Sequence, residues 1–140
     1  GIYPKGPFDQ LGDAQWRDGF EVNFFAAVQL VRELLPALRR SRGLIITINS
    51  GAGFHGVDQG SVYCSTKYAL KGFTDVLRLE EQGRVGVTSL HPGPTGTDMI
   101  AADDRVKMDP VDVARAARLA VDLSPETVID FLRVTPLRKS

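Results

Sequence analysis

A chain of 140 residues has the size of one domain, and 43% hydrophobic with 24% charged residues is the composition of an ordinary globular protein. Lys plus Arg and Asp plus Glu both number 17, so the formal net charge is zero. This balance argues against nucleic acid or an anionic membrane as a partner, and no apolar run is long enough to span a bilayer. The one cysteine, Cys64, cannot form an internal disulfide, which fits a reducing cytoplasm.

The first half of the chain predicts a loop, a helix and a strand. Residues 1–12 are rich in Gly and Pro, which is typical of a connecting loop. Over residues 13–40 apolar side chains recur at steps of three and four, which predicts a long amphipathic helix with Asp13 as its N-cap. Residues 44–48 are mostly β-branched and apolar on both faces, as in a buried strand of a parallel sheet.

The second half continues the same alternation. In chain order we expect a loop at residues 50–60, a helix at 61–82 and a strand at 85–90. A helix capped by Asp109 follows from residue 110 onward, and a last strand spans residues 127–134. Alternating helices and strands build an open α/β sheet, and we expect residues 1–140 to form a single domain.

Three residues that suit acid–base chemistry fall close together in this scheme. Tyr63 and Lys67 lie four apart near the start of a helix and therefore share a face. Ser50 follows strand 44–48 at its carboxyl end, where open α/β sheets bind ligands. Taken separately, a tyrosine packed on the sheet, a solvated lysine and a turn-forming serine are the alternatives.

The three side chains together suit the interconversion of an alcohol and a carbonyl. Free tyrosine has a pKa near ~10, which is too high for acid–base catalysis at neutral pH. An ammonium group ~4–6 Å away, at an effective dielectric of ~20, favours the phenolate by about 3–4 kcal/mol, or about 2–3 pKa units. We therefore expect Lys67 to lower the pKa of Tyr63, and Ser50 to hold the substrate oxygen by a hydrogen bond.

Ser50 with segment 63–67, Tyr-Cys-Ser-Thr-Lys, resembles the serine and the Tyr-x-x-x-Lys signature of the short-chain dehydrogenases/reductases. The resemblance implies a Rossmann-like, doubly wound parallel α/β sheet. It also implies an oxidoreductase that transfers a hydride between NAD or NADP and a small-molecule alcohol or carbonyl substrate. In this family the tyrosine is the acid–base residue, the lysine also holds the nicotinamide ribose and the serine orients the substrate, which gives these roles to Tyr63, Lys67 and Ser50.

Two further segments carry the resemblance. Asn23 resembles the family's asparagine, which binds a water that links the lysine to a proton relay; a capped or kinked helix position is the alternative. Segment 92–97, Pro-Gly-Pro-Thr-Gly-Thr, resembles the family's Pro-Gly-x-x-x-Thr segment, which meets the nicotinamide carboxamide, and alone would be a turn. The resemblance therefore assigns cofactor binding to Tyr63, Lys67, Pro92, Gly93, Thr95 and Thr97.

A glycine pattern at residues 51–56 matches G-x-G-x-x-G after a strand, but residues 57–60 separate it from the next helix, so we expect a flexible loop on the substrate side. The family's own glycine-rich turn follows its first strand and is absent here. Gly1 resembles the last glycine of the family's Asn-Asn-Ala-Gly segment. We therefore expect an incomplete sheet without the N-terminal cofactor-binding half, an open edge on strand 44–48, and little cofactor binding or turnover by the 140 residues alone.

The sequence also bears on metals, partners and alternatives. His55 and His91 lie far apart without Cys or carboxylate at ligand spacing, so we expect solvated or loop histidines and no metal site. The helices that contain Asn23 and Tyr63 resemble those through which family members dimerise, so we expect a homo-oligomer. One alternative is a non-catalytic dimerisation or regulatory module. The other is an epimerase or dehydratase of the same superfamily, which usually carries a larger C-terminal substrate domain.

Overall fold

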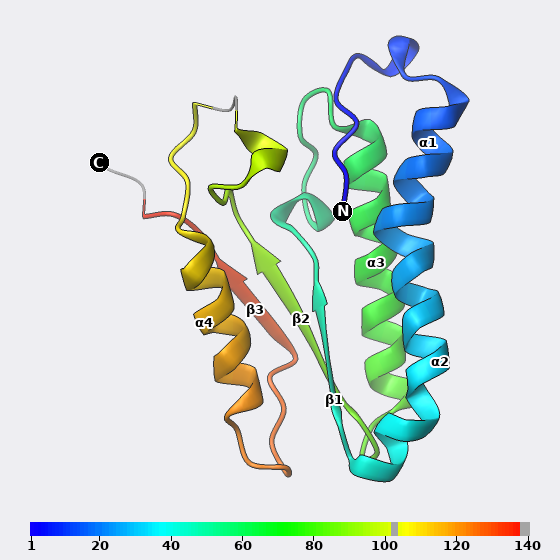
Figure 1. Cartoon of the computed structure of the whole chain (residues 1–140), viewed down its shortest axis with the longest axis vertical. Helices are drawn as coiled ribbons and strands as arrows, with labels where there is room; N and C mark the ends of the chain where they lie inside the picture. Colours follow the sequence, from blue (N-terminus) through cyan, green and yellow to red (C-terminus); the bar gives the residue numbers. More distant parts are fainter. Residues whose placement is uncertain (102–103, 138–140) are drawn as a thin grey trace.

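Three parallel strands form the centre of the molecule, in the order β1-β2-β3 (Figure 1). The computed structural model describes residues 1–101 and 104–137. The strands are β1 (Leu44–Ile48), β2 (Gly86–Pro92) and β3 (Phe131–Val134). Both strand pairs are parallel, so all carboxyl ends meet at one edge of the sheet. The predicted α/β class with a parallel sheet is confirmed.

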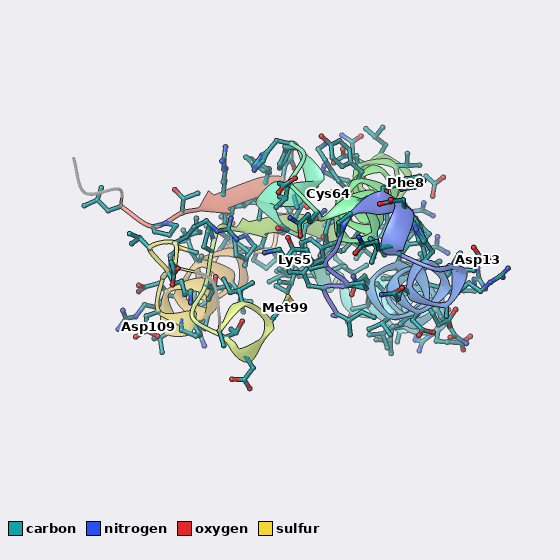
Figure 2. All side chains as sticks on the ribbon, turned by 90° about the horizontal axis from the view of Figure 1, so that it is seen from above. Lys5, Phe8, Asp13, Cys64, Met99 and Asp109 are labelled. Atoms are coloured by element: carbon teal, nitrogen blue, oxygen red, sulfur yellow. The ribbon has the colours of Figure 1, made fainter. Side chains whose placement is uncertain are left out.

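Helices cover both faces of this sheet (Figure 1). On one face, α1 (Asp13–Phe20), a π-helical turn η2 (Glu21–Phe25) and α2 (Ala26–Ser41) form one long rod beside α3 (Ser61–Glu80), and α4 (Pro110–Val121) covers the other. Figure 2 shows the molecule from above. Phe8, Asp13 and Cys64 lie on the side of α1 and α3, and Met99 and Asp109 lie on the side of α4. Within the described ranges, no helix has the length and apolar character that crossing a membrane requires.

The starts of α1 and α4 have different local causes. α1 follows Gly12, whose N–H donates to the side-chain oxygen of Gln15 at 2.8 Å, so the predicted N-cap role of Asp13 is wrong. Gln15 thus forms the half of a capping box in which the side chain of the third helical residue accepts the N–H of the N-cap residue. α4 begins as predicted, because the Asp109 carboxylate accepts the N–H of Val111 at 2.9 Å.

The main core lies where β1 and β2 meet α2 and α3. Four apolar side chains in it are buried and touch one another: Ile45, Leu77, Val85 and Val87. Farther along the helices, Gly19 lets α1 lie close against α3, because a Cβ at this position would collide with a methyl group of Val62. This close approach places the first turns of α3 beside α1 and beside the N-terminal segment.

Among the described residues, β1 is a free edge of the sheet, as predicted for strand 44–48. Ile48 at its end is 51% exposed although the strand is largely apolar. A groove of about 360 Å³ runs along this edge, lined mainly by side chains of β1 and α2, and Asn23 and Lys67 also line it. The edge therefore leads directly to two of the residues that were singled out in the sequence.

In the part of the chain that the structure describes, short 3-10 turns lie at η1 (Phe8–Gln10), η3 (Gly51–Gly53) and η4 (Asp98–Ile100). The last strand is shorter than the predicted 127–134, since β3 pairs only from Phe131 onward. Thr127 instead donates its N–H to the carbonyl of Ser124 at 2.9 Å, which turns the chain before the strand begins.

Candidate active site

The fold brings Ser50 and Tyr63 into direct contact at the carboxyl end of β1. Ser50 follows β1 by two residues and precedes turn η3, where its hydroxyl oxygen accepts the N–H of Ala52 at 3.1 Å. Tyr63 lies in the first turn of α3, with its hydroxyl group near enough to that of Ser50 for Ser50 to lower the pKa of Tyr63. The loop between β1 and α3 therefore folds back, as the predicted site requires.

Burial dominates the protonation of Tyr63. Burial raises the pKa of Tyr63 above its usual 10.0, and the hydrogen bond from Ser50 lowers it in part. The predicted lowering by Lys67 is wrong for this state of the protein, because removing the phenolate from water outweighs a charge whose Nζ lies 5.7 Å from the ring centroid. The Tyr3 ring packs against Tyr63 with centroids 4.7 Å apart and contributes to this burial.

Lys67 is a buried cation held by a backbone carbonyl. Its side chain sits one turn after Tyr63 on α3, and its Nζ donates to the carbonyl of Ile48 at 3.0 Å. Burial lowers the pKa of Lys67 to about 8. Within residues 1–101 and 104–137 no carboxylate pairs with it, so Ile48 is its one hydrogen-bond acceptor there. Ser50, Tyr63 and Lys67 are called the acid–base trio below.

Asn23 joins the N-terminal segment to α3. Its Oδ1 accepts the N–H of Ile2 at 2.8 Å, and its Nδ2 donates to the Ile2 carbonyl at 2.8 Å and to Thr66 Oγ1 at 3.2 Å. Thr66 in turn donates to the carbonyl of Tyr63 at 2.8 Å. Asn23 lies in the π turn, so the alternative of an irregular helix position describes its backbone correctly, and both ends of its side chain are bonded to protein groups.

The segment after β2 reaches the same edge of the sheet as Ser50 but stays apart from the acid–base trio. Pro92 ends β2, and the Gly93 N–H donates to the carbonyl of Val134 at 2.7 Å. Thr95 donates its hydroxyl to the Gly93 carbonyl at 3.0 Å, while Thr97 is exposed. Among the described residues no hydrogen bond joins these four positions to the trio, and their assignment to cofactor binding stays a prediction.

The glycine pattern after β1 serves packing. Gly51, Ala52 and Gly53 are buried in turn η3, so the prediction of a flexible loop is wrong for these three residues. A Cβ at Gly53 would lie 3.0 Å from the carbonyl oxygen of Lys67, and only a glycine allows the turn to pack this closely on α3. The helix begins at Ser61, so no helix N-terminus follows the pattern directly.

The two histidines differ sharply in environment. His55 lies in an exposed turn, as predicted. His91 lies in β2 and is completely buried, so the prediction of a solvated or loop position is wrong for it. The strand predicted at 85–90 continues through His91, which follows the buried Leu90, and this continuation is the signal that could have placed it. Among the described residues, no group of three or more His, Cys, Asp or Glu side chains could hold a metal ion.

Tyr3 lies near the site, and the sequence analysis did not single it out. It comes from the N-terminal loop, where no periodicity or motif distinguishes it from its neighbours. Its position on Tyr63 results from the anchoring of the adjacent Ile2 by Asn23, which lies 21 residues away along the chain. The contact between Tyr3 and Tyr63 depends on residues far apart in the chain, so no local sequence pattern predicts it.

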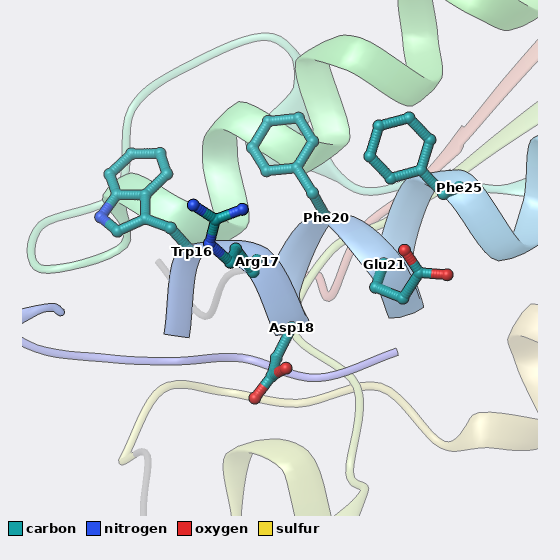
Figure 3. A pocket seen from close by; sticks show the side chains of 6 residues that line it. All are labelled: Trp16, Arg17, Asp18, Phe20, Glu21 and Phe25. Atoms are coloured by element: carbon teal, nitrogen blue, oxygen red, sulfur yellow. The ribbon is translucent and has the colours of Figure 1, made fainter. Parts of the chain in front are cut away.

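A further open hollow lies away from the trio. It has a volume of about 630 Å³ and is formed by six side chains of α1 and the π turn: Trp16, Arg17, Asp18, Phe20, Glu21 and Phe25. Figure 3 shows Phe20 and Phe25 pointing to the same side, with Asp18 directed away from them. None of the acid–base trio lines this open hollow, whose lining mixes three aromatic side chains with three charged ones. The candidate active site is therefore placed at the trio.

Comparison with known proteins identifies the family of the chain. The family described as short chain dehydrogenase matches residues 1–107. The chain belongs to this family. Human Retinol dehydrogenase 8 is 38% identical over 95 residues, which cover 66% of this chain and 30% of that protein. Uncharacterized oxidoreductase YbbO of Escherichia coli strain K12 is 35% identical over 137 residues, 95% of this chain and 49% of that protein. The chain thus spans less than half the length of both short-chain dehydrogenase relatives.

Solved structures extend the similarity over the whole chain. Serine dehydrogenase from Escherichia coli is 27% identical with a TM-score of 0.86, and its closed form complexed with NADP+ is 25% identical with a TM-score of 0.88. Each comparison covers 100% of this chain and 62% of the serine dehydrogenase chain. The Rossmann-like α/β fold class predicted from the family signature is thereby confirmed.

Proposed function

We propose that this chain is the C-terminal, catalytic part of an NAD- or NADP-dependent oxidoreductase that interconverts a small-molecule alcohol and its carbonyl form, and that residues 1–140 form one domain of it. The observation that carries the proposal is the meeting of three groups: the Ser50 hydroxyl acts on the buried Tyr63 hydroxyl and lowers its pKa, and the Lys67 ammonium lies 5.7 Å from the Tyr63 ring centroid. Membership of the short-chain dehydrogenase family and the similarity to an NADP+-bound serine dehydrogenase support it.

In this proposal Tyr63 exchanges the proton on the substrate oxygen. During reduction its hydroxyl group donates a proton to the carbonyl oxygen, and during oxidation the phenolate accepts the alcohol proton. Ser50 donates a hydrogen bond to the same oxygen and holds it within reach of Tyr63. The positive charge of Lys67 compensates the phenolate, and Asn23 supports the proton relay by holding the N-terminal segment against α3. Bound NAD or NADP supplies or accepts the hydride.

The residues present fit a dinucleotide that lies against the acid–base trio. A buried ammonium without a carboxylate partner is costly, and ribose hydroxyl groups are acceptors that would satisfy the Lys67 donors left over by Ile48. The Thr95 hydroxyl group donates its hydrogen bond to the Gly93 carbonyl, so the Thr95 hydroxyl oxygen remains an acceptor for the carboxamide N–H₂ group of a nicotinamide. Thr97 is exposed at the same edge, and the family's assignment of Pro92, Gly93 and Thr97 completes the proposed cofactor contacts.

The decisive experiment replaces Tyr63 by Phe in the complete gene product that contains these 140 residues. Oxidation or reduction of the nicotinamide is followed by absorbance with a panel of alcohols and carbonyl compounds. We expect Tyr63→Phe to lower turnover by about 10²–10⁴-fold, since it removes the acid–base group alone. Tyr68→Phe, on an exposed position of the same helix, is the matched control and should leave turnover unchanged. Turnover at the wild-type rate in Tyr63→Phe would sink the proposal.

The helices that carry Asn23 and Tyr63 also favour a homo-oligomer. α3 exposes three large apolar or aromatic side chains at helical spacing along one stripe, Tyr68, Val76 and Leu79. Exposed apolar stripes of this kind mark interfaces. We expect Val76→Lys to reduce the mass measured by light scattering after size exclusion from a dimer to a monomer. Val111→Lys, at an equally exposed position on α4, should not change it. Equal masses for wild type and Val76→Lys would rule out this interface.

The same preparation discriminates the non-catalytic alternative. A dinucleotide titration of the complete gene product should give saturable binding if the chain is part of an oxidoreductase. Stable dimers that bind neither NAD nor NADP would instead favour a dimerisation or regulatory module.

A further inference from the structure

His91 occupies an unusual position next to the proposed active site. It is a completely buried side chain, on the strand adjacent to β1. Its ring packs against two aromatic rings, with centroid distances of 4.5 Å to Phe54 and 5.0 Å to Phe131, and these two rings also contact each other at 5.4 Å. A buried imidazole that only filled space would be replaced at lower cost by an apolar side chain, because every buried polar atom needs a partner.

The two ring nitrogens of His91 have partners of different kinds. Nδ1 lies 2.9 Å from the carbonyl oxygen of Ser50, and Nε2 lies 2.7 Å from Oγ of Ser89. A carbonyl oxygen only accepts, so Nδ1 must carry the proton. In the neutral ring Nε2 then accepts the proton of the Ser89 hydroxyl group. Burial lowers the pKa of His91, which favours this neutral form.

Ser89 continues the contact into the interior of the molecule. Its Oγ lies 3.5 Å from Oγ1 of Thr47 on β1, and that oxygen lies 3.1 Å from Oγ1 of Thr74 on α3, whose hydroxyl group also reaches the Leu70 carbonyl at 2.7 Å. All of these side chains are buried. Nε2 of His91 therefore contacts a row of hydroxyl groups that links β2, β1 and α3, while Nδ1 faces the backbone of Ser50.

We propose that His91 is a positioning residue for Ser50. Its Nδ1–H donates a hydrogen bond to the Ser50 carbonyl, and this bond fixes the orientation of the Ser50 hydroxyl group toward Tyr63. The Ser50 carbonyl accepts a second hydrogen bond from the N–H of Gly53 at 3.1 Å, and the Ser50 N–H donates to Asn49 Oδ1 at 3.0 Å. Of these anchors, only His91 comes from a neighbouring strand. The effect of His91 on catalysis rests on the proposed function, whereas the hydrogen bond from His91 to the Ser50 carbonyl does not.

A pair of substitutions separates the two ring nitrogens. In His91→Asn the side-chain amide nitrogen can occupy the place of Nδ1 and keep a donor for the Ser50 carbonyl. In His91→Gln the amide lies at the distance of Nε2, so the contact to Ser89 can persist while the donor to Ser50 is lost. Both variants lose the ring and its contacts with the flanking aromatic rings. Differences between them therefore report the hydrogen bond to Ser50, not the packing.

The readout is the pKa of the Tyr63 phenol, measured by NMR with ¹³C-labelled tyrosine and assigned with Tyr63→Phe. Ser50 lowers this pKa through its hydrogen bond, so Ser50→Ala should raise it by about 0.5–1, the size expected for one hydrogen bond. We expect His91→Gln to raise it by a similar amount, the double variant Ser50→Ala/His91→Gln to add nothing further, and His91→Asn to stay near wild type. Equal pKa values in wild type and His91→Gln would overturn the proposal, as would equal shifts in both His91 variants.

A second measurement needs no substitution at His91. Two-bond ¹H–¹⁵N NMR spectra of the wild type distinguish the tautomers of its two histidines, with exposed His55 as the reference. We expect His91 to be neutral with the proton on Nδ1. A proton on Nε2 alone would overturn the proposal, because Nδ1 would then have no proton to donate to the Ser50 carbonyl.

Neither measurement requires turnover, so failure of the positioning by His91 and failure of the proposed function are distinguishable. If Tyr63→Phe retains wild-type activity, the oxidoreductase proposal fails while the tautomer and the pKa coupling still decide the role of His91. In an active complete gene product, His91→Gln should lower kcat in parallel with Ser50→Ala, and His91→Asn should restore most of it. A kcat for His91→Gln equal to that of wild type would overturn the proposed positioning.

Discussion

Lys67 makes the stability of this protein depend on pH in an unusual direction. Burial lowers its pKa from 10.5 to about 8. Between these two values the unfolded chain binds a proton that the folded chain does not. The free energy of unfolding therefore rises as the pH increases through this window. Below pH 8 the folded state bears the full cost of a buried charge.

The size of the effect follows from the two pKa values. Each pKa unit corresponds to 1.36 kcal/mol, so a difference of ~2.5 units amounts to about 3 kcal/mol in total, of which about 2 kcal/mol is recovered between pH 7 and pH 9.5. Lys67→Met has similar length and no charge. We expect it to be more stable than wild type at pH 7, less the hydrogen bond to the Ile48 carbonyl, and its advantage to shrink by about 2 kcal/mol at pH 9.5.

Urea unfolding of wild type and Lys67→Met at several pH values between 7 and 9.5 measures this difference. With slopes of about 1–3 kcal/mol per molar urea, the relative midpoints should move by about 1 M. Other titrating groups are common to both proteins, so the difference between the two curves isolates Lys67. An advantage of Lys67→Met that stays constant with pH would refute the reasoning. It would mean that the lysine keeps its ordinary pKa inside the fold.

Three substitutions, one of them a control, test the contacts that hold the helices in place. Gly19→Ala should destabilise the protein by about 1–3 kcal/mol in urea unfolding, because its methyl group collides with Val62, whereas Gly72→Ala, in an α3 position with open space, should stabilise it by about 0.5–1 kcal/mol. Stabilisation by both would contradict the close contact of α1 and α3. Glu81→Gln should cost about 1–3 kcal/mol at pH 7, because it breaks a paired arginine contact of a buried carboxylate. The Arg39 contact lowers the pKa of Glu81, so wild type should lose this advantage as the pH falls below about 4, and an unchanged advantage there would contradict it.

Local patterns predicted the elements well because each pattern lies inside one element. The β-branched run at 44–48 and the apolar steps of the first long helix depend only on which faces are buried. The π turn at Glu21–Phe25 escaped this reasoning. One extra residue in a turn leaves apolar steps of three and four almost unchanged, so the periodicity is the same with or without it.

The site was predictable where chemistry and spacing coincide within a short segment. Tyr63 and Lys67 are one helical turn apart, and Ser50 lies at the end of the preceding strand. The hydrogen bond from His91 to Ser50 joins residues 41 positions apart, and no local signal records it. The direction of the Tyr63 pKa was missed for a related reason. Coulomb attraction can be assessed from spacing, whereas burial depends on distant residues such as Tyr3.

The buried polar side chains of the site share a mode of attachment that affects every mutational test of it. Lys67, His91 and Asn23 each donate to a main-chain carbonyl, those of Ile48, Ser50 and Ile2. Removing any of them therefore frees a backbone segment as well as a functional group. A loss of activity in an alanine variant cannot then be attributed to chemistry alone. Substitutions that keep the donor while changing the side chain, as His91→Asn does, separate the two effects, since backbone geometry survives only where the donor does.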